Sequence, residues 1–521
     1  MTALRAVTVA ACSVASVAAG LRWLRVAQRE HYLPGAVTRF ALRWWPQDAA
    51  SAASVVVAVA GVALAWHWPA TALATALIVA TGPAGLGLRG RTSTLAWTRR
   101  LRTLAVVGTA LAAAAIAGAV VAGVGPLVAG AVALVVPLLV DLSTAITAPF
   151  ERTVAHAHVR RATERLRRVA PTVVAITGSY GKTSTKGYVA HLLAGTRTVV
   201  ASPASFNNRA GLARAVNENL ADGTDVFVAE MGTYGPGEIA ELCSWLTPAV
   251  AVITAIGPVH LERFRSEEAI VEAKAEILVD GATLVLNVDD PRLAALAAER
   301  AARGQPVRRV SSGTPDSDVL VRDDGDGLTV VVGGVEVGRA ATGARPGNVA
   351  CAVAVALELG VTPEQIAGRL GSLPTAPHRL ESATGAGGFT VLDDTYNANP
   401  AGAAAALQKL AATGVGSARR VVVTPGLVEL GPRQAAENAA FAVAAAAVAN
   451  DLVVVGLTNR RALLAGVAHV GEGDASDSGG HRPGLRGVVV GRREEAVAWV
   501  RDNLGPGDVV LYENDLPDHY P

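Results

Sequence analysis

Charge is scarce in this sequence. Only 17% of its 521 residues are Asp, Glu, Lys or Arg, whereas 51% are apolar; an ordinary soluble chain carries about 25% charge. Such a composition excludes a disordered chain and a nucleic-acid-binding arm. At roughly 150 residues per domain, the length favours three structural units.

Cysteine and lysine are scarcer still. The three cysteines, Cys12, Cys243 and Cys351, are too far apart to suggest a disulfide framework or a zinc cluster, and a reducing, cytoplasmic setting fits the polar part of the chain. Of 46 basic side chains only four are lysines. A retained lysine can mark a position that arginine cannot fill, although drift also leaves lysines behind. The four are Lys182, Lys186, Lys274 and Lys409.

Acidic residues are nearly absent from the first 150 residues, which hold three acids against 11 arginines. This part contains five charge-poor apolar runs, and a membrane span needs about 20 apolar residues. We therefore expect a multi-span α-helical membrane domain of five helices, of which the first two are short. The runs are Ala6–Leu21, Ala50–Trp66, Pro69–Leu88, Thr103–Gly123 and Pro126–Thr147.

The arginines predict the orientation. They gather in Arg22–Arg43 and Arg89–Arg102, whereas the connections around His67 and Val124 carry neither Arg nor Lys. Because positive loops stay inside, five spans predict an outside N-terminus and a cytoplasmic remainder at the cell (inner) membrane. A cleaved signal peptide over the first run is the alternative, and it would place the polar part outside.

From Ala170 onward, short β-branched runs alternate with alanine-rich helical stretches, a pattern typical of βα units in parallel sheets. Together with the membrane part, this predicts three domains, 1–150, 151–376 and 377–521, the last two being α/β domains that meet near His378. The expected strands are Thr172–Thr177, Asp225–Glu230, Ala249–Thr254 and Thr283–Asn287 in the first α/β domain, and Thr390–Asp394, Arg420–Thr424, Asp451–Gly456, Gly487–Val490 and Asp508–Tyr512 in the second.

A phosphate-binding loop follows the first of these strands. Its glycines let backbone amides face an anion, the lysine reaches the outer phosphates, and Thr183 offers a hydroxyl to magnesium. Ile176 stands where the common motif has its first glycine, and a tight turn with a surface lysine is the alternative. The loop residues are Gly178, Ser179, Tyr180, Gly181, Lys182, Thr183 and Ser184.

Two further side chains end neighbouring strands of the same predicted sheet. Glu230 and His260 are placed to hold metal ions against the phosphates, since ligand groups collect beyond the carboxyl ends of parallel strands. A structural histidine is the alternative for His260. Composition alone would make Lys274 a solvated helix charge.

Nine segments, in order, resemble the Mur ligase family of ATP-dependent peptide-bond-forming enzymes in cell-wall precursor synthesis. The similarity is strongest to the branch that adds D-alanyl-D-alanine to a UDP-linked muramoyl tripeptide. The segments are Thr177–Ser184, Ser205–Gly211, Ala229–Gly232, Ile256–Glu262, Glu272–Ile277, Asn287–Pro291, His378–Glu381, Asp393–Pro400 and Glu429–Gly431.

The resemblance implies a P-loop central domain, a Rossmann-like C-terminal domain, ATP and Mg²⁺ as cofactors, and an acyl-phosphate reaction. It also implies that Lys274 is carbamylated. Carbamylation turns an ammonium into an anion, which a site that binds magnesium favours, and arginine could not undergo this change. The implied catalytic residues are Lys182, Glu230, His260 and Lys274, the implied metal ligands Thr183, Glu230, His260 and Lys274, and the implied nucleotide contacts beyond the loop Asn287, Arg379 and Asp394.

The sequence departs from the family at Gly347 and Cys351, where adenine contacts are expected, and at Asn438, where the family has His. The UDP-binding N-terminal domain is missing, and the apolar runs stand in its place. We therefore predict a membrane-anchored acid–amine ligase acting on a cell-wall precursor carboxylate, UDP-linked or lipid-linked, with an amino acid or dipeptide amine. Membrane lipids are expected partners and nucleic acid is not.

Two alternatives remain open. One is an amino-acid ligase for a polyglutamate-like polymer or a lipid-linked peptide. The other is a nucleotide-driven transporter; against it, the sequence has no Leu-Ser-Gly-Gly-Gln signature, and Asp141 is the one clear ionisable residue of the predicted spans.

Overall fold

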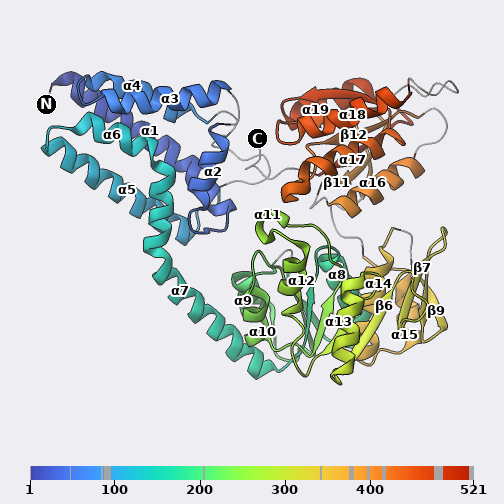
Figure 1. Ribbon diagram of the computed structural model, residues 1–521. Coiled ribbons are helices and arrows are strands. Elements are labelled where there is room, and N and C mark those ends of the chain that lie inside the picture. Colours follow the sequence, from blue (N-terminus) through green and yellow to red (C-terminus); the bar gives the residue numbers. More distant parts are fainter. Residues whose placement is uncertain are drawn as a thin grey trace. The chain divides into compact units, whose positions relative to one another are not determined.

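A computed structural model describes residues 2–46, 49–83, 86, 95–203, 206–340, 343–374, 381–395, 399–413, 418–474 and 485–514. The chain clusters into two compact units, one reaching Val154 and one beginning at Ala155. The first unit is built from helices and the second from two α/β domains (Figure 1).

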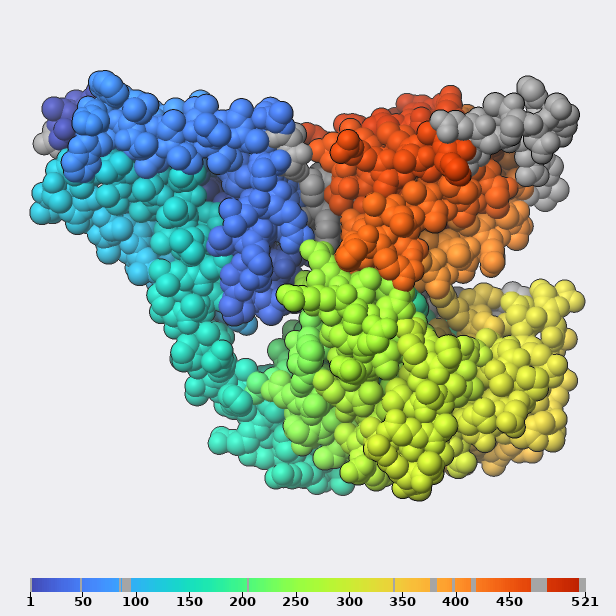
Figure 2. All heavy atoms as spheres, viewed as in Figure 1, coloured from blue at the N-terminus to red at the C-terminus, as the bar shows by residue number. Residues whose placement is uncertain are grey.

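The first unit packs its helices through small residues. Ala15, Ala19, Ala72 and Ala129 are almost fully buried, which lets helix backbones approach closely, while large apolar side chains of α1 and α5 remain exposed. Blue and cyan atoms mark this unit in Figure 2. The elements are α1 (Ala3–Arg29), α2 (Ala36–Trp44), α3 (Ala49–Leu64), η1 (Pro69–Thr71), α4 (Ala72–Thr81), α5 (Arg99–Val121), α6 (Gly125–Leu134) and α7 (Val136–Val169), the last of which continues into the second unit.

The prediction of five spans is not confirmed. By length and composition two described helices, α1 and α5, could cross a membrane, or up to four spans result if α2 with α3, and α6 with α7, each count as one. The run Pro69–Leu88 gives η1 and then α4, whose 10 residues rise only about 15 Å, half the thickness of a bilayer core.

Helix α1 (Ala3–Arg29) extends beyond the apolar run Ala6–Leu21 and includes arginines that are buried inside the unit. Arg22 is buried, and its Nη2 donates to the carbonyls of Val79 (2.6 Å) and Ala80 (2.8 Å) in the last turn of α4. The guanidinium thereby satisfies carbonyls that a helix end leaves unpaired. Arg22, which in the sequence marks the end of the predicted span, thus links α1 to α4.

The first α/β domain holds a nine-stranded sheet in the order β2-β3-β1-β4-β5-β6-β7-β8-β9. Apolar cores cover both faces. The strands are β1 (Thr172–Thr177), β2 (Val199–Ala201), β3 (Val226–Glu230), β4 (Val250–Ile253), β5 (Thr283–Asn287), β6 (Val307–Ser311), β7 (Val319–Asp323), β8 (Leu328–Val332) and β9 (Val335–Ala340). The helices are α8 (Lys182–Leu193), α9 (Arg209–Asn219), α10 (Glu238–Leu246), α11 (Leu261–Phe264), α12 (Glu267–Ala275), α13 (Pro291–Ala302), α14 (Pro346–Glu358) and α15 (Pro363–Leu370).

The second α/β domain holds a six-stranded sheet in the order β10-β11-β15-β12-β13-β14, in which only β10 runs antiparallel. Its strands are β10 (Glu381–Thr384), β11 (Thr390–Asp394), β12 (Arg420–Thr424), β13 (Asp451–Val455), β14 (Arg486–Val490) and β15 (Val509–Glu513). Its helical elements are α16 (Pro400–Ala412), η2 (Gly431–Arg433), α17 (Gln434–Ala446), α18 (Arg460–Asp474) and α19 (Arg493–Asn503).

All nine predicted strands are present, so the two α/β domains are confirmed. The strands that the sequence did not predict are β2 and the sheet edges, β6 to β9 and β10. Of these, β8 pairs antiparallel with both β7 and β9, and turns rather than helices connect them, so no βα period marks them. The interior strands β1, β3 and β4 run parallel and end at one edge, which is where the candidate site lies.

Candidate active site

The phosphate loop joins β1 to α8 and is held from two sides. Gly181 has a positive φ of 83°, and a β-carbon there would lie 2.1 Å from Asn348 Oδ1 of α14. A β-carbon on Gly178 would lie equally close to Thr254 Oγ1, after β4. Both glycines are therefore required by close packing.

Serine and lysine side chains of the loop close it further. Ser179 Oγ donates to the carbonyl of Gly257 (3.1 Å) and accepts from its amide (3.0 Å). Lys182, the first residue of α8, donates from Nζ to the carbonyl of Gly178 at 2.7 Å. Thr183 and Ser184 follow it half-buried at the start of the helix, where backbone amides and the helix dipole favour an anion.

The Tyr180 side chain is packed into the site. Its hydroxyl is buried, without a hydrogen-bond partner in the described part of the chain, and lies against Gly257, where a β-carbon would meet it at 2.1 Å. Burial, followed by the nearby carboxylates of Glu267 and Glu437, raises the pKa of this phenol above its ordinary value. Tyr180 therefore stays a neutral phenol at physiological pH.

Glu230 lies at the end of β3 and is 2% exposed. Lys186 Nζ of α8 stands 2.9 Å from Glu230 Oε2, and Asn207 Nδ2 donates to Oε1 at 3.4 Å. Sequence reasoning counted Lys186 among the rare lysines but gave it no role. It is the buried counterion of the predicted metal ligand.

Lys274 lies on α12 and is 3% exposed, so it is not a solvated helix charge. Desolvation, and secondly the positive charge of Lys182, hold the pKa of its amine well below the ordinary value. Within the described ranges no carboxylate forms an ion pair with it. Lys274 is thus a buried amine whose ammonium form is disfavoured by burial and by the charge of the phosphate-loop lysine.

His260 lies immediately before α11, as its N-cap residue, with a left-handed φ of 57°. Its Nδ1 pairs with Glu429 Oε2, from the second α/β domain, and its ring meets the edge of the Tyr234 ring at 5.2 Å between centroids. Among the residues that the structure describes, no three His, Cys, Asp or Glu side chains form a metal-binding group. His260 and Glu230 are thus each paired with another residue, not with one another.

Asn287 explains the departure at Gly347. Asn287 Nδ2 donates to the carbonyl of Thr254 at 3.0 Å, and a β-carbon on Gly347 would lie 2.8 Å from that nitrogen. Cys351, one turn on, is fully buried in α14, and burial raises the pKa of its thiol to about 12. It is a core residue of the first α/β domain.

Two family models match this chain. Residues 176–338 match the Mur ligase middle domain, and residues 378–512 match the Mur ligase glutamate ligase domain. The UDP-N-acetylmuramoyl-tripeptide--D-alanyl-D-alanine ligase of Mycobacterium tuberculosis (strain H37Rv) is 37% identical over 368 residues, which cover 65% of this chain and 69% of that protein. The chain belongs to the Mur ligase family. It is therefore an ATP-dependent, amide-bond-forming ligase.

Other Mur ligases are similar over shorter or more distant matches. The Bacillus subtilis enzyme of the same name is 31% identical over 279 residues, 51% of this chain and 58% of that protein. The structure of MurF ligase from Thermotoga maritima in complex with ADP has a TM-score of 0.58 at 25% identity, covering 69% of this chain and 80% of that one. The matched segments lie within the two predicted α/β domains, whose boundaries remain predictions.

The Mur ligase C-terminal domain presents a buried pair of acids. Asp394 at the end of β11 stands in register with Glu513 at the end of β15. Glu513 is fully buried; burial, and secondly Asp394, raise its pKa well above the ordinary value, while Arg345 of the first α/β domain opposes this. Sequence reasoning named Asp394 and missed Glu513, which no motif marks.

Three buried asparagines fix the loop that carries Glu429. Asn438 accepts from the amide of Leu427 (2.8 Å) and donates to its carbonyl (2.9 Å). Asn459 donates to the carbonyls of Pro425 and Leu427, and Asn514 to that of Gly426. The departure at Asn438 is thus a structural substitution that holds backbone in place.

Acidic and basic side chains join the two α/β domains beside this loop. Glu267 of α12 accepts from Arg292 Nη1 (2.5 Å) and from Arg433 Nη1 (2.6 Å) of η2. The predicted nucleotide contact Arg379 lies outside the described residues.

Proposed function

We propose that this Mur ligase joins an amine, D-alanyl-D-alanine as in the names of its relatives, to the carboxylate of a muramoyl tripeptide. The observation that carries the ligase chemistry is Lys274. It is buried, its pKa is lowered, and its positively charged neighbour is Lys182.

Carbamylation of Lys274 fits this environment. A neutral Nζ attacks the carbon of CO₂, an N–C bond forms, and one proton leaves, so that the side chain becomes an anion. An ammonium buried beside Lys182 is disfavoured, whereas an anion there is attracted to Lys182 and to magnesium.

The other roles follow the positions of the side chains. The phosphate loop, from Gly178 to Ser184, would cradle the triphosphate, and Asn287, Arg379 and Asp394 would contact the nucleotide. Thr183, Glu230 and the carbamate supply oxygens, which Mg²⁺ prefers, and His260 is the remaining predicted ligand. Bound magnesium would neutralise charge on the phosphoryl group as it passes to the substrate carboxylate.

We further propose that the first unit anchors the ligase in the cell membrane. The ends of α1 and α5 that carry Arg22–Arg29 and Arg99–Arg102 belong to one side of this unit, because Leu24 and Leu104 line one end of the same cavity. Arg99 Nη2 pairs with Glu151 of α7 (3.1 Å), the helix that continues toward the ligase domains. The positive-inside rule then places those domains in the cytoplasm.

The acyl substrate is proposed to be lipid-linked, because the unit that precedes the ligase domains is helical and contains helices long and apolar enough to cross a membrane. An enzyme needs to hold the non-reacting end of a substrate to orient its carboxylate. A ligase for a polyglutamate-like polymer is the second candidate. The transporter hypothesis is disfavoured, because Asp141 has a structural role. Its carboxylate accepts hydrogen bonds from the amides of Val37 (3.3 Å) and Thr38 (2.8 Å) at the start of α2.

Reconstitution tests the proposal. Full-length protein in vesicles, given ATP and Mg²⁺, should release phosphate only when both D-alanyl-D-alanine and a muramoyl tripeptide are present. Phosphate release that ignores the added amine would contradict a ligase function on these substrates. A cytoplasm-dependent reporter fused after Arg102 or Arg168 should be active and one near His67 inactive; the reverse would contradict the orientation.

A further inference from the structure

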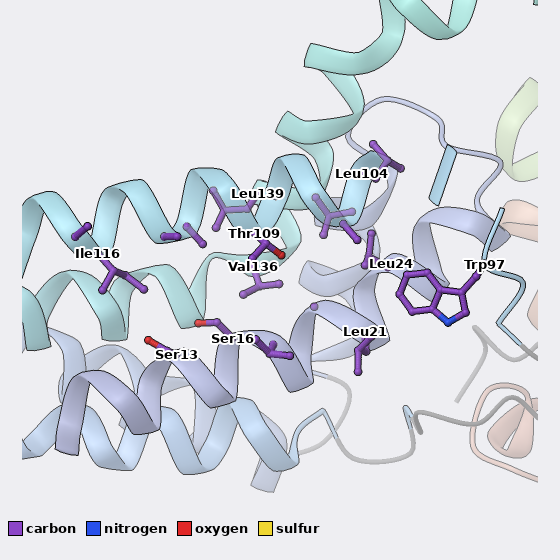
Figure 3. A pocket seen from close by; sticks show the side chains of 18 residues that line it. Ser13, Ser16, Leu21, Leu24, Trp97, Leu104, Thr109, Ile116, Val136 and Leu139 are labelled. Carbon is purple, nitrogen blue, oxygen red and sulfur yellow. The ribbon is translucent and has the colours of Figure 1, made fainter. Parts of the chain in front are cut away.

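A cavity of about 540 Å³ lies between α1 and α5 in the first unit and is closed by the start of α7. We call it the α1–α5 groove; Figure 3 shows side chains of both helices pointing into it. Its size is that of a small-molecule site. The residues that matter below are Ser13, Gly20 and Leu24 of α1, Leu104 and Ile116 of α5, and Leu139 of α7.

The lining offers little to a polar ligand. Most of the lining residues are Leu, Ile, Val, Ala or Gly. The hydroxyls of Ser13 and Ser16 donate to the carbonyls of Val9 and Cys12 on their own helix, both at 2.8 Å. Apolar cavities do not retain water, so the occupant that this chemistry favours is a hydrocarbon chain.

The two ends of the groove differ in charge. At the Leu24 and Leu104 end, α1 continues to the buried Arg25 and to Arg29, which Glu30 follows. The first turn of α5 carries Arg99, Arg100 and Arg102, of which Arg99 and Arg102 are exposed and Arg99 pairs with Glu151. At the Ser13 and Ile116 end, α5 has no charged residue and α1 has only Arg5, two turns away. A chain lying in the groove would thus have its anionic end at the arginine side.

We infer that the α1–α5 groove holds the hydrocarbon chain of the lipid-linked acyl substrate, with the diphosphate of that lipid at the arginine end. This inference rests on the proposed function, because it assigns a binding site to the lipid part of the proposed acyl substrate. Exposed apolar residues on both helices, such as Val17 and Val106, put the groove within reach of membrane lipid.

Glycine offers a matched pair of variants. A β-carbon on Gly20 meets no atom within 4 Å, and Gly20 lines the groove, so the backbone accepts a side chain there and Gly20→Leu occupies part of the cavity. Gly118 of α5 is equally open, exposed, and absent from the lining. Gly118→Leu is therefore the control.

The experiment compares two acyl substrates with the full-length protein in vesicles. Gly20→Leu should raise the KM for a lipid-linked muramoyl tripeptide about tenfold, because several methylene groups lose their burial. The KM for the UDP-linked form should not change, and Gly118→Leu should match the wild type with both. Equal effects of Gly20→Leu on both substrates, or no effect, would overturn the inference.

A photoreactive long-chain isoprenoid diphosphate separates failure of the groove from failure of the proposed function. It should label α1 and α5 in the wild type and Gly118→Leu but not in Gly20→Leu. Unchanged labelling in Gly20→Leu, or equal competition by phosphatidylcholine, overturns the groove assignment even if lipid-linked substrate is used. Groove-dependent labelling without use of any lipid-linked substrate instead overturns the proposed acyl substrate, and with it the role given to the groove.

Discussion

Both units bury charged side chains, but they satisfy them differently. In the first unit, Arg22 and Asp141 meet the backbone at the ends of helices, α4 and α2 respectively. In the second unit, Lys274 and Glu513 are buried with pKa values moved toward their neutral forms.

This difference distinguishes charged groups that stabilise the fold from buried ionisable groups that are available for catalysis. A guanidinium or carboxylate on a helix end supplies bonds that the backbone would otherwise lack. A buried amine without an acid partner costs stability, and such groups concentrate at functional sites. Each of the following predictions either tests or refines this contrast, from the largest effect to the smallest.

Replacing Lys274 should have the largest effect. Lys274→Arg keeps a basic side chain of similar length but cannot form a carbamate, so ligation should fall by about two orders of magnitude or more, the scale of a lost catalytic electrostatic contact. Phosphate release with saturating substrates measures this. Lys409→Arg, on the exposed face of α16, should be silent, and a near-normal Lys274→Arg would remove Lys274 from the site.

Although Lys274→Met should also abolish ligation, we expect it to increase the stability of the fold. The folded state lowers the pKa of this amine, so below the ordinary lysine pKa the unfolded chain binds a proton that the folded chain does not. The wild type therefore loses stability as the pH falls from about 10. In buffer freed of CO₂ and bicarbonate, where the amine is unmodified, Lys274→Met should remove that loss and raise the thermal midpoint at neutral pH; a lower midpoint would mean that the amine is satisfied.

Asn438→Ala should destabilise the C-terminal domain by about 1–3 kcal/mol, because the amide of Leu427 loses its acceptor, while the carbonyl of Leu427 loses one donor and keeps Asn459. Ligation should fall with it, since the loop presents Glu429 to His260. Asn503→Ala, which removes one bond at the exposed end of α19, is the matched control for thermal unfolding. Equal midpoints for the two variants would show that Asn438 does not hold the loop.

Asp141→Ala should cost about 1–2 kcal/mol, the value of a helix cap, because two amides of α2 lose their acceptor. Thermal unfolding in detergent, followed by a probe in the first unit, measures the loss. Soluble nucleotide binding by the second unit should persist, so a parallel loss of ATP affinity would argue that Asp141 acts in coupling, as a transporter would require.

Glu513→Gln should give the smallest effect, a change in the slope of the unfolding free energy against pH. Because the folded state raises the pKa of Glu513, its protonated form contributes stability that is complete below the ordinary glutamate pKa and is lost as the pH rises through the folded value. Gln mimics the protonated acid and should flatten this decline in unfolding free energy. A slope equal to that of the wild type would mean that Glu513 does not titrate as described.

The sequence predicted the parts of the molecule where local pattern and topology agree. Strand β1 and its loop follow from β-branched residues and glycines, and the rare lysines led to Lys274 before its burial was visible. Antiparallel edges such as β7–β9 carry no βα period, and the buried partners Lys186, Asn348 and Glu513 become apparent only when distant elements are brought together. In the first unit, the length of the apolar run 69–88 predicted a membrane span, but the α-helix within it ends at Thr81.

Lysine scarcity has a consequence for covalent labelling. Three of the four lysines, Lys182, Lys186 and Lys274, lie within or beside the phosphate site and are at least partly buried, whereas Lys409 is exposed. Among the lysines, an amine-reactive reagent should therefore modify chiefly Lys409 in the folded protein, in addition to a free α-amino group. Later modification of Lys274 would report opening of the site, and bicarbonate should protect that residue by occupying its nitrogen.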